Sequence, residues 1–370
     1  MKFSCEKALL QNAILTASRA VSPKSTIPCL EGVLLRAGVA LQLTGYNLET
    51  GITVHVGAQI QEAGSCVMPA RLFFDIVRKL PDEMVSITVD HKQQVSIRAG
   101  AAFFQITAMD SEDYPELPDV NGKSGVTMPQ SALKAMISGT IFSVSENQAR
   151  PIQTGCLMEV TEDSVTMVAV DSFRLARRTW HTENAANHTL KFVVPAAGLK
   201  EIERILEDSD EPVTFTLGDK HILFSIGDAL LVSRVLEGEF IDWRRVVPTN
   251  CGTVLTANVA ELTSSIERVS LIISEKVKSP VRCVFGDNMA DFRTANTIGS
   301  AHDTCSIAGN GGELEIGFNS RYLLDALRVI PSEEVTLELQ NGLSPIVFTP
   351  CDKKYDFAYM VLPVRLRSNS

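Results

Sequence analysis

The residues that could perform chemistry in this chain are few and scattered. Ser172 has no histidine close by in the sequence, and the chain contains no Gly-x-Ser-x-Gly turn, which would present a serine nucleophile. The glycine cluster from Gly309 to Gly312 precedes an expected strand, so it lacks the helix N-terminus of a phosphate loop and predicts a turn. A loop-like stretch separates His181 from His188, and we expect both at the surface. These patterns predict no catalytic residue.

The eight cysteines also lack the spacing of a functional site. They form no Cys-x-x-Cys pair, and a zinc site needs clustered ligands. Several precede apolar residues, as Cys156 precedes Leu157 and Cys283 precedes Val284. We therefore expect buried thiols in a reducing compartment, no metal site and no cofactor.

Composition and charge exclude two further classes of protein. No apolar run approaches the roughly 18 residues of a membrane span, and Glu6 and Gln11 interrupt what would be the apolar part of a signal peptide. We therefore expect a cytoplasmic protein. The net charge of −10 argues against holding nucleic acid by bulk attraction. A closed ring escapes this objection, because it need only present local positive charge to the duplex.

The chain repeats itself, and the repeat sets its organisation. At a constant offset of 250, the stretch from Arg71 to Ile87 matches the stretch from Arg321 to Leu337. A middle copy lies at about half of that offset, where Val193 corresponds to Val67. Turn-rich junctions of Pro, Asn and Gly come after each of the first two copies. This predicts three domains, at residues 1–120, 121–250 and 251–370.

Each copy holds the same order of elements: strand, helix, strands, and then strand, helix, strands again. Leu10 and Ile14 carry helical spacing, as do Phe73, Ile76 and Val77. Alternating apolar runs between the helices predict strands. Two helices against two sheets, three times per chain, is an α+β layer architecture.

Five segments in the right order resemble the β subunit of bacterial DNA polymerase III, and the resemblance covers the whole chain. They are VMPARLFFDIVR from Val67, VDSFRLA from Val170, EFIDWRRVVP from Glu239, FNSRYLLD from Phe318 and YMVLPVRL from Tyr359. Each segment is a weak signal alone, but five of them on a threefold repeat of this period are specific.

The resemblance implies a DNA sliding clamp, a non-catalytic processivity subunit of the polymerase holoenzyme. Its three clamp domains would form a head-to-tail ring homodimer, with helices lining the hole and sheets outside. Duplex DNA would pass through the ring without sequence preference. The protein partners implied are the polymerase α subunit, the clamp loader and other proteins with clamp-binding motifs, which the ring would tether near the primer end.

The same family has one peptide-binding pocket per subunit, between the middle and third domains. The resemblance places it on residues of both domains and of the tail: Val170, Ser172, Phe173, Arg174, Leu175, Ile241, Arg245, Val246, Val277, Asn319, Tyr322, Leu343, Pro345, Met360, Val361, Leu362, Pro363, Val364, Arg365 and Leu366. An apolar groove with few polar groups suits extended, partly hydrophobic peptides.

This chain departs from the family pattern at four places. Phe173 replaces a commonly polar residue, Val277 replaces a larger aromatic residue, and Pro345 replaces a small polar residue. Residues 367–370 extend beyond the usual leucine end. These changes affect the expected peptide preference more than the existence of the pocket.

For DNA, the resemblance points to loop residues of the first two domains and to basic residues on the inner helices. The candidates are Lys24, Arg71, Arg78, Lys79, Gln148, Arg150, Lys200 and Arg204. Pro151 and Ile152 stand where some relatives have two tyrosines, so we expect no base stacking there. Contacts to phosphates would be indifferent to sequence.

A second hypothesis is a repetitive α+β enzyme, such as a hydrolase, with its active site at a domain junction. The apolar tail with Arg245 nearby favours the clamp, because a hydrolase has no need of either feature. Gel filtration separates the two hypotheses, since a ring dimer elutes at about twice the chain mass of 40.3 kDa.

Overall fold

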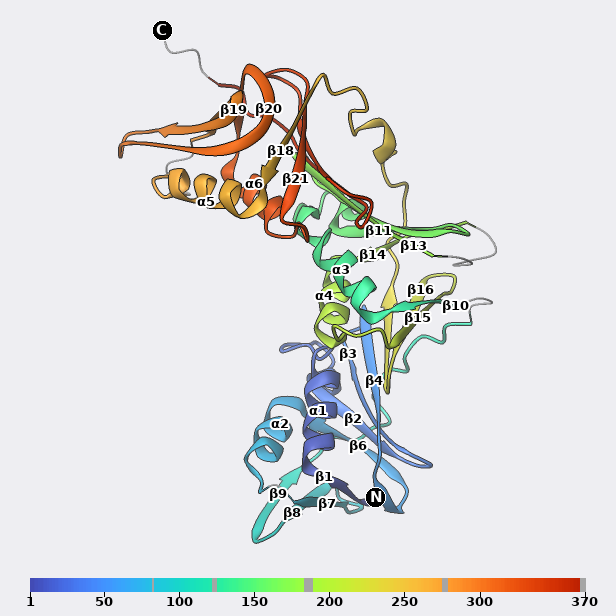
Figure 1. The fold of residues 1–370 in the computed structure, drawn as a ribbon. Helices are drawn as coiled ribbons and strands as arrows, with labels where there is room; N and C mark the ends of the chain where they lie inside the picture. Colours follow the sequence, from blue (N-terminus) through green and yellow to red (C-terminus); the bar gives the residue numbers. More distant parts are fainter. Residues whose placement is uncertain (82, 122–124, 183–188, 275–278, 367–370) are drawn as a thin grey trace. The chain divides into compact units, whose positions relative to one another are not determined.

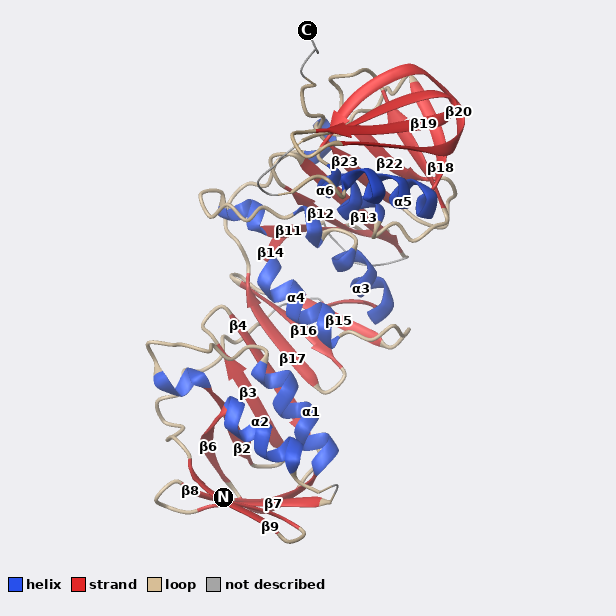
Figure 2. Cartoon of the chain, turned by 90° about the vertical axis from the view of Figure 1, so that its left-hand side faces the viewer, coloured by secondary structure: helices blue, strands red, loops and turns tan. Residues whose placement is uncertain are grey.

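The computed structural model describes residues 1–81, 83–121, 125–182, 189–274 and 279–366. The chain forms two compact units. Unit 1 contains residues 1–134 and 197–235, and unit 2 contains residues 135–196 and 236–370. Both units combine helices with antiparallel sheets, which confirms the predicted α+β class (Figures 1 and 2).

Unit 1 contains two sheets. The five-stranded sheet has the order β5 (Gln59–Glu62), β1 (Lys2–Glu6), β7 (Met84–Val89), β8 (Gln94–Ala99) and β9 (Ala102–Thr107). The eight-stranded sheet has the order β10 (Gly125–Pro129), β15 (Pro212–Leu217), β16 (His221–Ile226), β17 (Ala229–Arg234), β4 (Thr50–Val56), β3 (Leu41–Tyr46), β2 (Gly32–Ala37) and β6 (Gly64–Pro69). The pairing of β17 with β4 therefore joins strands of the first and middle repeats in one sheet.

Helices α1 (Lys7–Ser18) and α2 (Ala70–Lys79) lie side by side in unit 1 (Figure 2). As the spacing predicts, α1 buries Leu10 and Ile14 against the strands, because residues three and four apart share one face of a helix. Helices α3 (Gln130–Ser138) and α4 (Ala196–Ile205) occur where the chain passes between the two units.

The described part of unit 2 contains a ten-stranded sheet, with helices α5 (Val259–Ser270) and α6 (Ser320–Leu327) packed beside it. The sheet has the order β14 (Leu190–Pro195), β11 (Gly155–Val160), β12 (Ser164–Val170), β13 (Arg174–His181), β23 (Phe357–Val361), β22 (Ile346–Pro350), β21 (Glu334–Leu339), β18 (Thr253–Asn258), β20 (Ser300–Phe318) and β19 (Val281–Ala295). Helices α5 and α6 pack together, and α5 also packs on β19 and β20 (Figure 1). The predicted domain boundaries stay a prediction, because both large sheets combine strands of two repeats.

Each repeat contains the same side-chain-capped turn, which confirms the repeat at the level of single hydrogen bonds. The Oδ1 atoms of Asn47, Asp171 and Asn296 each accept backbone N–H bonds from residues two and three positions further on. Short polar side chains stabilise such turns by replacing a backbone acceptor. The strand after this turn is β4 in the first repeat and β13 in the second.

The prediction of a turn at the glycine cluster is wrong. Gly309–Gly312 lie inside β20, opposite a point where the β19–β20 register shifts. Gly309 and Gly312 have φ values of 115° and 62°, which glycine adopts without steric cost. The cluster forms an irregularity that bends a long strand, because runs of glycine suit bulges as well as turns.

The thiols are mostly buried, as predicted, with two exceptions. Cys251 is partly exposed, and Cys351 is exposed after the end of β22, with its Sγ 3.4 Å from the Oγ1 of Thr336. Within the described ranges, no three His, Cys, Asp or Glu side chains lie close enough together to hold a metal ion. No helix in this part of the chain is long and apolar enough to cross a membrane.

Candidate functional site

The last strand of the chain lies inside the sheet of unit 2. Strand β23 pairs with β13 on one side and with β22 on the other, so Leu175 lies opposite Met360 and Arg174 lies opposite Val361. Met360 and Val361 are 3% and 1% exposed. The strand-like pairing continues one residue further, since the Leu362 N–H donates to the Phe173 carbonyl at 2.8 Å. The exposed part of the predicted pocket on the tail therefore begins at Leu362.

Arg174 is a buried cation that joins the middle and third repeats. Its Nε donates to Asp171 Oδ2 at 3.0 Å, and its Nη1 donates to Asp325 Oδ2 at 2.6 Å. Its guanidinium also lies 4.6 Å from the Tyr322 ring centroid and 5.6 Å from that of Phe142. Only 9% of Arg174 is exposed, so two carboxylates and two aromatic faces replace its water.

Phe173 presents an aromatic surface next to Tyr322. Its ring stacks on that of Tyr322, with centroids 5.7 Å apart and an interplanar angle of 20°. Phe173 is 53% exposed. Helix α6 positions Tyr322, because Asn319 caps the helix by accepting the Arg321 N–H at 3.0 Å. The exposed Phe173 ring and the half-buried Tyr322 ring, which come from different repeats, form one aromatic platform.

The segment from Leu236 to Val247 covers the outer face of strands β11–β14. Ile241 and Trp243 pack there against Val170 and Leu175 of the predicted pocket. Glu159, on β11, fixes the segment by accepting from Trp243 Nε1 at 3.2 Å and from Arg244 at 2.8 Å, and Lys191 lies 3.5 Å away. Burial is the largest single influence and would raise the pKa of the Glu159 carboxyl. The hydrogen bonds from Arg244 and Trp243, together with the charges of Arg244 and Lys191, outweigh burial and hold the pKa below its usual value.

Other members of the predicted pocket are more exposed. Arg245, in a short 3-10 helix (η4, Trp243–Arg245), forms an ion pair with Asp242 at 3.0 Å. Val246, Leu343 and Val364 are 40%, 75% and 40% exposed. The remaining exposed or half-buried members are Ser172, Pro345, Pro363, Arg365 and Leu366. Val277 lies outside the described residues.

All eight candidate DNA-binding residues are exposed. Arg71, Arg78 and Lys79 lie on α2, and Lys200 and Arg204 lie on α4. Lys24, Gln148 and Arg150 lie in loops. Arg78 and Arg204 each form an ion pair one helical turn away, with Asp75 and Glu201. Exposed ion pairs of this kind are weak, so both arginines can exchange these partners for phosphate.

Sequence reasoning missed several residues that support the site. Asp325 and Phe142 contact Arg174, and Glu159 and Trp243 hold the covering segment. The sequence offered one signal for this network. Arg174 lies in a strand that is expected to be buried, and a buried arginine requires acidic partners.

The three repeats match the domains of one family in order. The N-terminal, central and C-terminal domain descriptions of the DNA polymerase III beta subunit match residues 1–118, 127–242 and 244–365. The beta sliding clamp of Staphylococcus epidermidis is 30% identical over 99% of both chains, and that of Staphylococcus aureus is 29% identical. A solved DNA polymerase III beta subunit from Eubacterium rectale superposes with a TM-score of 0.94 at 32% identity, over 99% of this chain and 100% of that one. The solved sliding clamp of Bacillus subtilis superposes with a TM-score of 0.94 at 30% identity, with the same coverage of both chains.

The fold is therefore that of a sliding clamp with three clamp domains. The chain belongs to the DNA polymerase III beta subunit family, the bacterial beta sliding clamps. It is a processivity factor without catalytic activity of its own, and the hypothesis of a domain-junction hydrolase is set aside.

Proposed function

We propose that this clamp recruits its partners by binding an extended peptide segment against the platform of Phe173 and Tyr322. The observation that supports this proposal is that the exposed Phe173 ring stacks on the half-buried Tyr322 ring, which lies over a buried arginine paired with two carboxylates. A buried ion network holds the platform rigid, so little side-chain freedom is lost on binding. The tail from Leu362 to Leu366 forms one wall, and Val246 and Leu343 add exposed apolar surface.

The partners proposed are the polymerase α subunit, the clamp loader and other proteins with clamp-binding motifs. A peptide with a glutamine followed by an apolar pair fits a surface that is mostly apolar and has few polar groups. Removal of one large apolar side chain from such a contact costs about 1–2 kcal/mol, or roughly five- to thirtyfold in affinity.

The test is peptide titration by fluorescence anisotropy with Phe173→Ala. We expect the Kd to rise about tenfold. Leu9→Ala is a matched control, because Leu9 is similarly exposed, at 47%, but lies on α1 in unit 1. A second variant ends after Leu362, which leaves β23 intact and removes the exposed wall. Unchanged affinity in both variants would show that the peptide binds elsewhere.

We also propose that two copies close head to tail into a ring. In unit 1, β17 of the middle repeat pairs with β4 of the first, and in unit 2, β23 of the third pairs with β13 of the second. The first part of β20 corresponds in the third repeat to β4 and β13, and β9 corresponds in the first repeat to β17 and β23. This part of β20 pairs with β19 on one side, and β18 reaches only Ile307 and Ala308 on the other. β9 ends the five-stranded sheet and carries the exposed Phe103 and Phe104, so it is suited to pair with β20 of a second copy.

Analytical ultracentrifugation tests the ring. The wild-type chain should sediment as a dimer at micromolar concentration without DNA. Phe104→Asp should shift it toward monomer, because a carboxylate would then be buried in the interface between the two copies. Phe173→Asp is the control, since it places the same charge on an exposed phenylalanine outside the proposed interface. A wild-type monomer would contradict the ring.

DNA would pass through this ring, with the eight exposed candidate residues facing phosphates. The net charge of −10 predicts weak attachment to short linear duplexes and long residence on circular DNA after loading. Linearising a loaded plasmid should release the clamp, and equal retention on both forms would indicate ordinary electrostatic binding. From this role we infer that the protein acts in the cytoplasm.

A further inference from the structure

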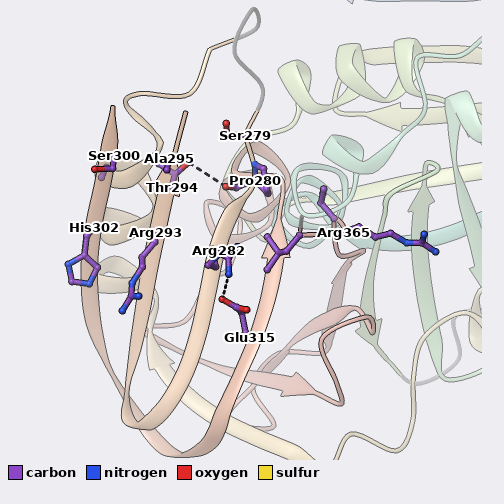
Figure 3. A pocket seen from close by; sticks show the side chains of 13 residues that line it. Ser279, Pro280, Arg282, Arg293, Thr294, Ala295, Ser300, His302, Glu315 and Arg365 are labelled. Carbon is purple, nitrogen blue, oxygen red and sulfur yellow. Dashed lines mark hydrogen bonds and ion pairs between the residues drawn. The ribbon is translucent and has the colours of Figure 1, made fainter. Parts of the chain in front are cut away.

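Among the described residues, no segment covers the outer sheet face of the third repeat, whereas the corresponding face of the middle repeat is covered. A constant offset of 125 relates two cross-strand pairs on these faces: Val168 with Arg177 in the middle repeat, and Arg293 with His302 in the third. In the middle repeat, Trp243 covers this position and lies 5.8 Å from the Arg177 guanidinium. In the third repeat, the same face lines a cavity of about 1140 Å³ (Figure 3).

The side chains on this face of the third repeat also differ from those on the corresponding face of the middle repeat. Positions held by Leu157, Val168 and Val193 in the middle repeat correspond to Arg282, Arg293 and Gly317 in the third. The lining of the cavity holds three arginines, His302 and one carboxylate, that of Glu315, and the Asp291 carboxylate pairs with two of these side chains. Basic groups still outnumber carboxylates here, in a chain whose net charge is −10. An apolar covering segment would therefore fit this face poorly.

The cations are held in place but remain accessible. Asp291 pairs with Arg293 at 2.6 Å and with His302 at 2.6 Å, and Arg282 pairs with Glu315 at 2.7 Å. The side chains of Arg293 and His302 are still 60% and 57% exposed. Figure 3 shows Arg293 and His302 together on neighbouring strands, with Arg282 between them and the tail. Arginines arranged in this way can accept additional carboxylates.

The cavity is continuous with the proposed peptide site through the tail. Val364 donates its N–H to the Gly317 carbonyl at 2.7 Å, and the Leu366 side chain packs on Gly317. Val364, Arg365 and Leu366 therefore form one wall of the cavity and also belong to the predicted peptide pocket. Figure 3 shows the Arg365 side chain directed away from strands β19 and β20, on the other side of the tail.

We propose that this cavity, the flank groove, binds an acidic extended segment that adjoins the pocket-binding motif in a partner protein. The inference rests on the proposed peptide site and extends it by a second, charge-selective contact. A partner seated on Phe173 and Leu362 continues over the tail, and its carboxylates meet Arg293, His302 and Arg282.

Anisotropy titrations on the full chain test this with peptides that share one pocket-binding motif. One peptide is unextended, and the others carry three glutamates or three lysines at either end. We expect glutamates at one end to lower the Kd three- to tenfold and lysines there to raise it. Arg293→Ser should abolish the gain from glutamate without changing the affinity of the unextended peptide.

Two controls make the result specific. Arg328→Ser removes an equally exposed arginine of unit 2, paired with Glu267 outside the groove, and should leave the gain intact. A chain ending at Leu366 should also keep it. Equal affinity of all the peptides, or equal weakening of all of them by Arg293→Ser, would overturn the flank groove while the proposed function stands. Failure of the unextended peptide to bind would overturn both.

Discussion

Removal of the buried cation at Arg174 should destabilise unit 2 far more than removal of an exposed arginine. Arg174→Ala leaves the side chains of Asp171 and Asp325, which are 14% and 23% exposed, facing each other without a counter-charge. Breaking a buried ion pair from one side costs about 3–5 kcal/mol. In a unit of roughly 200 residues, each kcal/mol lowers the Tm by about 2–4 °C, so we expect a fall of about 6–20 °C.

Tryptophan fluorescence isolates this effect, because both tryptophans of the chain, Trp180 and Trp243, lie in unit 2. Thermal melts followed at these residues should show the fall in Arg174→Ala. Arg328→Ala serves as the exposed control and should change the Tm by no more than about a degree or two.

A rescue experiment separates lost charge pairing from lost packing. Adding Asp171→Asn and Asp325→Asn to Arg174→Ala removes the unpaired carboxylates and should recover at least half of the lost Tm. Asparagine preserves the turn at residue 171, since Asn47 and Asn296 make the same turn in the other repeats. A Tm of Arg174→Ala within about 2 °C of the wild-type Tm would refute the reasoning. A triple variant with a lower Tm than Arg174→Ala would refute it as well.

Two more predictions rest on local geometry. Glu159→Gln should lower the Tm of unit 2 at pH 7. The folded-state pKa of Glu159 lies below its usual 4.5, so the ionised form is the stabilising one, and the difference in Tm should disappear as the pH falls from 4.5 through that pKa. A difference that stays constant across this range would contradict the account. Gly45→Ala should destabilise unit 1 by about 1–3 kcal/mol, because the added Cβ would lie 2.0 Å from the Ala17 carbonyl oxygen. A Cβ added at Gly38 meets no atom within 4 Å, so Gly38→Ala should keep the wild-type Tm in circular dichroism melts. An equal loss of stability in the two variants would show that the α1–β3 contact is not tight.

The sequence predicted the helices and the repeat well, because both are local patterns. Leu10 and Ile14 are buried on α1, as their spacing requires, and the turn residues Asn47, Asp171 and Asn296 recur at one position of the repeat. Periodicity and turn chemistry act over a few residues and can be read without the fold.

Contacts between distant segments could not be predicted in the same way. Asp325 lies 151 residues from Arg174 in the chain, and only strand order brings them together. The apolar ending from Met360 to Val364 suits an edge strand, a groove wall or a central strand. In the structure this ending has two parts. Met360 and Val361 belong to a central strand, whereas Val364 is 40% exposed.

The three repeats differ mainly in the segment that succeeds each one along the chain. Tyr114 and Leu117, after β9, pack on the outer face of the first repeat, and the segment that contains Trp243 packs on that of the second. In the part of the chain that the structure describes, no such segment packs on the outer face of the third repeat. That face is charged and open, whereas the corresponding face of the second repeat is mostly apolar and covered. An exposed apolar face of that size would favour aggregation, whereas Arg293 and His302 keep the face hydrated. The tail lies between this open face and the pair Leu362 and Phe173, so one extended partner could reach both the aromatic platform and the flank groove.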